Sequence, residues 1–558
     1  MITLLPTTTI NATVRRLENR LHRVRLRGDA RTASSILPNG SIDAIALVCA
    51  SLIIFSIGWS RLYDPFAGDQ ALFLIGAQKL HAGGVLYRDF WDIKQPGIFA
   101  FFLLGGLLFG FNQIGEHAAD LIWQLAFAGA LVLVLRECFN KQRFVAAFAP
   151  IAVVGAYYAG SSSWHLLQVE ELVGLPLFCC TYLLIEALRK SSKRLAIASG
   201  VFGGIVLGFK LVSFVILVGL ICAVIFSMRA TISRDILRAT FAQWFIGVLI
   251  PIAVVVGYAV VHSTEAVTLR TTFILPIQVL FSAEMHAPMA RLTDSSLRFL
   301  LYFRGLILLG LIGLFSADRT SAQAKTWRLV CIAWIVSDVI VIAIQVSSWW
   351  QYHFLLLVPP VGILATLGLA SIIRNGLASY RHACVFLALA GVVAYVAVPL
   401  PQGAVGTIML VGQERPFESA GALERYRINA NSEYADALED SALARHRDAG
   451  ANVYVFGDPL IYLDSDTAQP IAMNSWAIQL FTPALWRQTV SELCKVRHEY
   501  VFVFDRFVGR LQSGDNGVVM SLLSRNYVRV ERTRHGEWFK LASSSNDAHV
   551  CGGRPTST

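Results

Sequence analysis

The stretch GDQALFLIGAQKLHAGGVLYRDFWDIKQPG, residues 68–97, says more about the fold than any other part of this chain. It follows an apolar run, residues 42–59, that is long enough to enter a bilayer. The stretch itself holds three Asp, two Lys, one His and several aromatic side chains. So many polar groups directly beside a membrane segment indicate either a solvated loop or a reaction site at the membrane surface.

The composition is that of an integral membrane protein. The chain has 558 residues, of which 55% are hydrophobic and only 15% charged, whereas a soluble domain is about a quarter charged. The apolar runs are continuous, which argues against the alternating pattern of a membrane β-barrel. The net charge of +10 gathers in short loops and in an Arg-rich N-terminal arm, where positive charge sets membrane topology and does not indicate nucleic-acid binding.

Apolar segments recur along the first 400 residues, and basic clusters between them mark the cytoplasmic side. Residues 97–111 break this alternation, because they are short and Gly-rich and follow Pro96 directly. We therefore expect a re-entrant or juxtamembrane helix there and about 11 full crossings elsewhere. The apolar segments are 42–59, 97–111, 118–135, 144–160, 171–188, 195–209, 211–227, 243–261, 299–316, 328–346, 354–373 and 383–399.

The resulting fold class is an all-α membrane bundle followed by a soluble α/β domain. We expect a cytoplasmic basic tail (1–41), a membrane domain (42–400) whose first external loop is 60–117, and an extracytoplasmic domain (401–558). In the last part, ANVYVFGDP and YVFVFD alternate like short buried strands, and YVRVERTRHGEWFKLA is typical of a hairpin. Helical stretches are expected around 484–497 and 515–525. Cys494 and Cys551 can pair if this domain lies outside the cytoplasm.

Chemistry at a membrane surface needs a base, cations for an anionic group, and aromatic side chains at the boundary between apolar and polar surroundings. Asp69 opens a run with helical periodicity, and Lys94 stands just before Pro96, at headgroup depth. Each residue also has a purely structural interpretation. Asp is among the best N-caps of a helix, and Lys commonly snorkels to the membrane interface.

Three stretches together resemble the C-type (GT-C) membrane glycosyltransferases, the superfamily of the dolichyl-phosphate-mannose protein mannosyltransferases and the lipid A aminoarabinose transferases. The first is the acid, helix, YRD and Lys-before-Pro order of residues 68–97. The second is LLQVEELVGLPL (166–177), in which an acid begins a span after the second external loop. The third is the late aromatic turn WWQYHFLLLVPPVGILA (349–365). The resemblance covers roughly residues 40–400.

The resemblance implies an inverting transfer of one monosaccharide from a polyprenyl-phosphate donor to an envelope acceptor outside the bacterial inner membrane. A hydroxyl is a poor nucleophile, so a positioned carboxylate must take its proton, and the departing phosphate needs fixed cations. By resemblance Asp69 is the general base and Lys94 holds the lipid phosphate. Glu170, or the adjacent Glu171, orients the acceptor or the sugar, although either acid can also be a solvated loop residue.

Other candidates are less specific. Asp92 lies two residues before Lys94, where close relatives carry an acid adjacent to the Lys, so an ion pair with Lys94 or Arg88 competes with a sugar contact. Arg88 and Arg270 are candidate second ligands of the lipid phosphate, and surface charge is the alternative. Tyr352 and His353 are expected to contact the sugar or acceptor, or else to belong to the aromatic belt at the membrane surface. The further Arg residues in or beside the third external loop are Arg291 and Arg298. Trp164, His165 and His81 are expected to be structural or solvated.

No cofactor is predicted, and the absence of an Asp-x-Asp pair in the second external loop favours a metal-independent reaction, with a divalent metal left open. The expected partners are a polyprenyl-phosphate sugar, an envelope acceptor and membrane lipids. A transporter or flippase of lipid-linked glycans is the main alternative, but it would place ionisable groups near the middle of the bilayer. A non-catalytic scaffold is a third possibility.

Overall fold

The computed structural model describes residues 39–139, 143–282, 285–316, 322–376, 399–446, 451–496 and 498–542. The chain divides into two compact units, 1–49 and 50–558, and apart from the first part of α2 everything below concerns the second. Residues 383–398 of the expected crossing at 383–399 and most of the basic tail lie outside the described residues.

Eight helices in the described ranges are long and apolar enough to cross a membrane. The bent pair α15 (Met289–Tyr302) and α16 (Arg304–Phe315), with 77° between its helices, is a ninth if it counts as one span. The eight lie where eight of the 11 crossings are expected, and the bent pair covers 299–316. They are Ser41–Tyr63, Gln113–Cys138, Arg143–Gly160, Val169–Lys190, Leu211–Met228, Arg234–Val261, Ala322–Ile344 and Gln351–Arg374.

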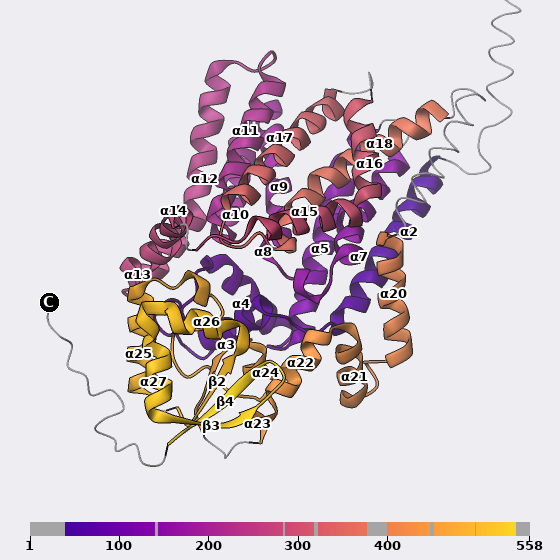
Figure 1. The fold of residues 1–558 in the computed structure, drawn as a ribbon. Coiled ribbons are helices and arrows are strands. Elements are labelled where there is room, and N and C mark those ends of the chain that lie inside the picture. Colours follow the sequence, from indigo (N-terminus) through magenta and orange to yellow (C-terminus); the bar gives the residue numbers. More distant parts are fainter. Residues whose placement is uncertain are drawn as a thin grey trace, which may run out of the picture. The chain divides into compact units, whose positions relative to one another are not determined.

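The expected crossing at 195–209 forms helix α10 (Lys193–Phe209), which is not among the eight because it has only 17 residues. The principal helices of the membrane part appear in Figure 1 and follow one another in chain order. They are α2 (Asn39–Ser60), α3 (Asp69–His81), α4 (Pro96–Phe109), α5 (Gln113–Leu135), α7 (Ala156–Gly160), α8 (Val169–Leu172), α9 (Gly174–Lys190), α10, α11 (Phe214–Met228), α12 (Arg234–Val261), α13 (Glu265–Leu269), α14 (Leu275–Phe281), α15, α16, α17 (Ala322–Ile344), α18 (Val358–Gly376) and α20 (Pro399–Glu414).

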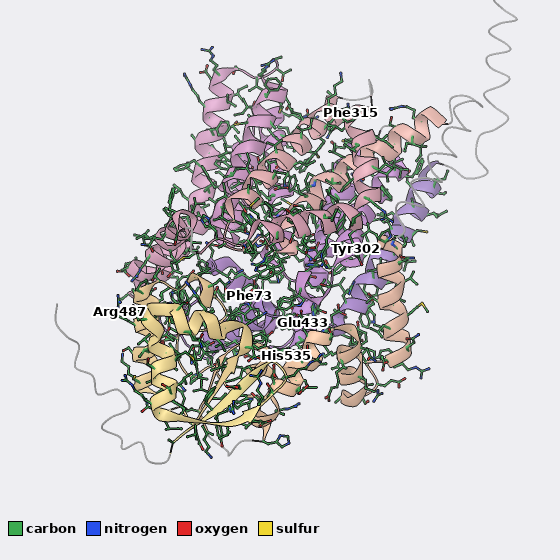
Figure 2. The ribbon with its side chains drawn as sticks, viewed as in Figure 1. Phe73, Tyr302, Phe315, Glu433, Arg487 and His535 are labelled. Carbon is green, nitrogen blue, oxygen red and sulfur yellow. The ribbon has the colours of Figure 1, made fainter. Side chains whose placement is uncertain are left out.

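Small residues let the membrane helices approach each other closely. At the crossing of α10 and α12, a Cβ added to Gly200 would meet the carbonyl oxygen of Trp244. At the crossing of α16 and α18, a Cβ on Gly313 would meet the backbone of Leu364. Without a hydrophobic driving force between helices in lipid, such close backbone packing is a main source of association. Tyr302, at the bend between α15 and α16, and Phe315, at the end of α16, have exposed side chains (Figure 2).

Helix α4 occupies the segment that breaks the topological alternation. Its 14 residues span about 21 Å, which is less than the roughly 30 Å of a hydrocarbon core. The chain then turns at Gly110, and α5 begins after the N-cap Asn112, whose side chain accepts a hydrogen bond from Gly115 N. The last turns of α4 expose Leu104, Leu107 and Leu108, an apolar tip on a helix too short to cross.

The last part of the described chain forms a four-stranded sheet of order β1-β2-β4-β3. Strand β1 pairs parallel with β2, β2 pairs antiparallel with β4, and β3 and β4 form the expected hairpin. Helix α26 contacts β2 and α27 contacts β3, and α25 packs against α27 (Figure 1). The elements are α21 (Ala420–Ala430), α22 (Ser432–Asp440), α23 (Ala442–Arg445), β1 (Val453–Phe456), α24 (Leu460–Asp464), α25 (Pro483–Lys495), β2 (Tyr500–Phe504), α26 (Asp505–Ser513), α27 (Val518–Asn526), β3 (Tyr527–Arg532) and β4 (Gly536–Leu541).

Candidate active site

Asp69 and Lys94, predicted from one loop, lie side by side. The Lys94 Nζ is 2.9 Å from Asp69 Oδ2, and the two side chains are 29% and 13% exposed. Both are therefore reachable by a substrate but largely shielded from water. In such surroundings a charge pair interacts more strongly than it would in bulk water.

The backbone explains why Asp69 faces the site and does not cap its helix. Gly68 is the N-cap of α3 and adopts φ +59°, a conformation that L side chains rarely adopt. A Cβ on Gly68 would lie 2.5 Å from both Trp164 and Trp476, so these two indoles also require glycine. The N-cap interpretation of Asp69 is wrong, because its carboxylate contacts other side chains and makes no capping hydrogen bond.

Both the backbone and the side-chain ammonium of Lys94 are fixed by contacts with neighbouring residues. The Tyr87 hydroxyl donates to the Lys94 carbonyl at 2.8 Å, and the ammonium lies 5.6 Å from the centre of the Phe73 ring. Burial alone would lower the pKa of Lys94, but the charge of Asp69, with smaller contributions from Tyr352 and other acids, outweighs it and raises that pKa. The ammonium therefore stays charged at every physiological pH and is available to a phosphate.

A second ion pair lies in the membrane part near the first. Glu170, at the start of α8, binds the ammonium of Lys210, the residue that directly follows α10. Lys210 Nζ also donates to Gln345 Oε1 at 2.6 Å. His353 Nδ1 lies 3.5 Å from Glu170 Oε1, and its Nε2 lies 3.2 Å from Ser348 Oγ.

Tyr352 and His353 connect the two ion pairs. Their rings stack with centroids 4.6 Å apart, and the Tyr352 hydroxyl lies 3.5 Å from Asp69 Oδ2 while His353 faces Glu170. The three stretches that carry the resemblance, far apart in sequence, therefore meet in one place. Their roles in binding sugar or acceptor stay predictions.

Asp92 lies beneath Lys94 and is 1% exposed. Its Oδ1 accepts from the Lys94 backbone N at 2.8 Å, and its Oδ2 accepts from the side-chain amide of Asn474 at 3.4 Å. Burial raises the pKa of Asp92 to about 6, against the lowering effect of Lys94. Neither Lys94 nor Arg88 forms an ion pair with Asp92, whose carboxylate instead holds the backbone of the loop at Lys94. A contact of Asp92 with the sugar or the acceptor stays a prediction.

Several important side chains were not singled out from the sequence. Trp476, far away in the C-terminal part, donates its indole N–H to Asp69 Oδ1 at 2.6 Å. Trp164, expected to be structural, stacks on Trp476 with centroids 6.2 Å apart. Lys210 had a visible signal, because it is the single charge between two long apolar runs. Trp476 had none, because nothing local in the sequence links it to residue 69.

The remaining candidates lie elsewhere. Arg88 is exposed, pairs with Asp89 at 2.9 Å, and lines a cavity of about 490 Å³. Arg270 is exposed at the end of α13, next to Thr271, whose hydroxyl accepts from Trp91. Glu171 is fully buried, and within the described ranges neither of its carboxylate oxygens has a hydrogen-bond partner. Of the further Arg residues, Arg291 lies over the ring of Trp350 and Arg298 pairs with Asp294.

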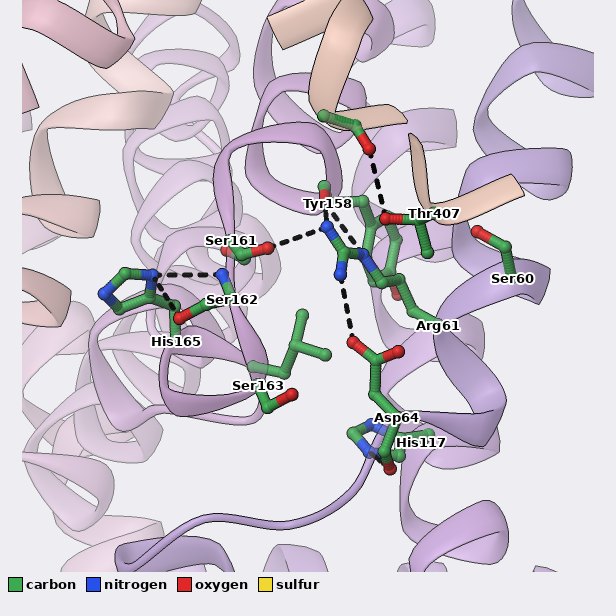
Figure 3. A network of polar contacts seen from close by, with 12 residues as sticks. Ser60, Arg61, Asp64, His117, Tyr158, Ser161, Ser162, Ser163, His165 and Thr407 are labelled. Carbon is green, nitrogen blue, oxygen red and sulfur yellow. Dashed lines mark hydrogen bonds and ion pairs between the residues drawn. The ribbon is translucent and has the colours of Figure 1, made fainter. Parts of the chain in front are cut away.

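A buried network fixes the start of the loop that carries Asp69 and Lys94 (Figure 3). The Arg61 guanidinium donates to the carbonyl oxygens of Tyr158 and Ser161 and to Asp64 Oδ2 at 3.0 Å. Asp64 Oδ1 accepts from the Tyr426 hydroxyl of α21 at 2.6 Å. The chain between the first membrane helix and Asp69 is therefore anchored on both sides.

Within the described ranges, no group of three or more His, Cys, Asp and Glu side chains is arranged to hold a metal ion. The groups that do meet are two carboxylates, two ammonium groups, a phenol, an imidazole and an indole. Such a set can accept a proton and balance the charge of an anionic phosphate.

No protein-family model matches the sequence, and no curated protein matches it. The structure is similar to solved structures of ArnT from Cupriavidus metallidurans, one bound to undecaprenyl phosphate and one in the apo state. Each has 12% sequence identity and a TM-score of 0.56, and each match covers 92% of this chain and 99% of the other. A match to the arabinosyltransferase EmbB from Mycobacterium smegmatis has 14% identity, a TM-score of 0.42, and covers 71% of this chain and 40% of the other. The membrane fold expected from the resemblance to C-type glycosyltransferases is confirmed.

Proposed function

We propose that this chain is an inverting membrane glycosyltransferase that moves one monosaccharide from a polyprenyl-phosphate donor to a hydroxyl of an acceptor outside the membrane. The observation that carries the proposal is the contact of the Asp69 carboxylate with the Lys94 ammonium at 2.9 Å, in a partly shielded position beside α4. A base and a phosphate ligand at this spacing can serve the two ends of one substitution at an anomeric carbon.

In the proposed reaction, Asp69 accepts the proton of the acceptor hydroxyl as its oxygen bonds to the anomeric carbon. The bond from that carbon to the phosphate oxygen breaks, and its electron pair stays on the phosphate. Lys94, which remains protonated, balances the charge that develops there. Glu170 is held in place by Lys210 and His353, and it is the second acid that orients the acceptor or the sugar.

Two observations support the choice of donor and compartment. One of the similar ArnT structures is bound to undecaprenyl phosphate, which is a lipid phosphate of the proposed kind. Cys494 is disulfide-bonded, and disulfides persist in oxidising compartments, which favours an extracytoplasmic C-terminal part. Its expected partner, Cys551, lies outside the described residues.

A test uses cells that lack the native gene and produce the wild-type chain or the Asp69→Asn variant. Loss of the general base should lower transfer by about 100-fold or more. The envelope then lacks one sugar and the corresponding polyprenyl-phosphate sugar accumulates, both of which mass spectrometry detects. A transporter or a scaffold would be little affected by the same change.

The matched control is Asp294→Asn, which removes an exposed carboxylate that pairs with Arg298 at the surface. It should leave the envelope glycans unchanged. Wild-type glycans in cells that produce well-folded Asp69→Asn protein would refute the proposed function.

A further inference from the structure

The two oxygens of the Asp69 carboxylate have different surroundings. Oδ2 faces the membrane part, with the Lys94 ammonium at 2.9 Å and the Tyr352 hydroxyl at 3.5 Å. Oδ1 faces the C-terminal part, where the indole N–H of Trp476 donates to it at 2.6 Å. The carboxylate therefore lies between a cationic side and an aromatic side.

Trp476 belongs to a segment, residues 472–476, that is fixed to the loop carrying Asp69, Trp91 and Lys94, which we call the catalytic loop in this proposal. The Trp91 backbone N donates to the Ala472 carbonyl at 2.9 Å, and the Asn474 amide donates to the Trp91 carbonyl at 2.5 Å. Asn474 Oδ1 in turn accepts from the backbone N of Trp476. On the other side, Ser475 Oγ donates to the Val455 carbonyl of β1. The position of the indole is thus set by the sheet and by the loop together.

The Trp476 ring is also held from its sides. It stacks on Trp164 with 16° between the ring planes, and the Arg506 guanidinium lies 4.7 Å from its centre. Both contacts fix the orientation of the Trp476 ring, and neither brings a second cation into contact with the Asp69 carboxylate. A neutral N–H donor can orient a carboxylate without forming the ion pair that a Lys or Arg in the same place would form.

We propose that Trp476 is a positioning residue for Asp69 and that segment 472–476, with Arg506, forms the acceptor side of the active site. This inference rests on the proposed function. In an inverting substitution the nucleophile and the leaving group lie on opposite faces of the anomeric carbon. Because Lys94 places the phosphate on the Oδ2 side, the acceptor hydroxyl approaches on the Oδ1 side, beside Trp476.

The site is then complete only when the C-terminal part is seated on the catalytic loop. The acceptor specificity of the enzyme accordingly resides in the C-terminal part, and its donor specificity in the membrane part. The chemical class that the acceptor side admits is a hydroxyl-bearing molecule with an anionic or polar group for Arg506 and an apolar face for the two indoles.

The test replaces Trp476 in the full chain with β-(3-benzothienyl)alanine, which keeps the ring shape but has sulfur in place of N–H, and in parallel with Phe. Two quantities are measured: the affinity of purified protein for undecaprenyl phosphate, and the rate of sugar transfer in host membrane vesicles that contain donor and acceptor. Transfer should fall on the order of tenfold with the analogue, since a hydrogen bond to a charged group is lost. The affinity for undecaprenyl phosphate should stay at the wild-type value.

The matched control is the same analogue at Trp538, whose indole N–H donates to the Asp440 carbonyl within the C-terminal part at 2.9 Å. It should lower thermal stability while leaving the transfer rate per folded molecule unchanged. Equal transfer by wild-type protein and the Trp476 analogue would overturn the inference while leaving the proposed function intact. Failure of the wild-type chain to bind undecaprenyl phosphate or to transfer sugar would instead overturn the proposed function.

A second variant, Arg506→Met, tests the acceptor side directly. Transfer should be several-fold slower when the acceptor density in the vesicles is low, and nearly unchanged when it is high. The affinity for undecaprenyl phosphate should be unchanged. A loss of undecaprenyl phosphate affinity in this variant would place Arg506 on the donor side and contradict the assignment.

Discussion

Burial of the Asp92 carboxylate beside Asp69 and Lys94 makes the stability of the folded protein depend on pH. In the folded protein burial raises its pKa to about 6, from 3.8 in an unfolded chain. The folded state therefore binds more protons than the unfolded state between these values, and stability falls as the pH rises from about 4 to about 6. Over that pH range the free energy of unfolding falls by about 3 kcal/mol.

Asp92→Asn should remove this loss, because an amide oxygen can still accept from the Lys94 backbone N but carries no charge. We expect the variant to melt at a higher temperature than the wild type at pH 7.5, and the difference to vanish as the pH approaches 4. Thermal unfolding of detergent-solubilised protein across this pH range measures it. A difference that is the same at every pH would show that the charge of Asp92 is not its cause.

At the residue scale, Asp69 and Lys94 were singled out by their chemistry beside a first membrane segment and by the resemblance, and the fold brings them into contact. Their roles as base and phosphate ligand stay predictions. Glu171 could not be separated from Glu170 by sequence, because adjacent residues at a helix start point in different directions that only packing determines. Trp476 could not be found, because its contact with Asp69 spans 407 positions of sequence.

At the scale of helices, close packing of α10 on α12 depends on glycine. A side chain at Gly200 would collide with the backbone of α12, so Gly200→Leu should force the two helices apart and destabilise the protein by about 1–3 kcal/mol. Gly208→Ala, in the same helix, is the control, because a Cβ there meets nothing within 4 Å. A melting temperature of Gly200→Leu equal to that of Gly208→Ala would mean that the crossing tolerates a wider spacing.

Most elements could be anticipated from periodicity, and the exceptions have physical causes. Long apolar runs bounded by basic clusters gave the positions of the described spans, and alternating residues gave β1, β2 and the hairpin of β3 and β4. One feature was beyond the pattern. The 77° bend between α15 and α16 depends on how the helices pack, and hydropathy does not register packing.

For the molecule as a whole, the sequence indicated a membrane part and a C-terminal α/β part but not how they join. The joining contacts are single side chains scattered over the chain. Asn474 binds Trp91, Trp476 binds Asp69, and Tyr426 binds Asp64 at the end of the first membrane helix. Such contacts leave no periodic signal, so the composite nature of the site emerged only from the structure.

Tyr426→Phe tests whether this junction supports the whole site. The change removes the hydroxyl that donates to Asp64 Oδ1 at 2.6 Å, and Asp64 is 1% exposed. A buried carboxylate oxygen without its donor costs about 1–3 kcal/mol, so the melting temperature should fall by several degrees. Because Asp64 lies only five residues before Asp69, transfer should also fall several-fold.

Tyr527→Phe is the control for this variant, since the Tyr527 hydroxyl donates to the backbone carbonyl of His498. It should lower stability less and leave transfer unchanged, whereas equal loss of transfer in both variants would mean that the junction acts only through global stability.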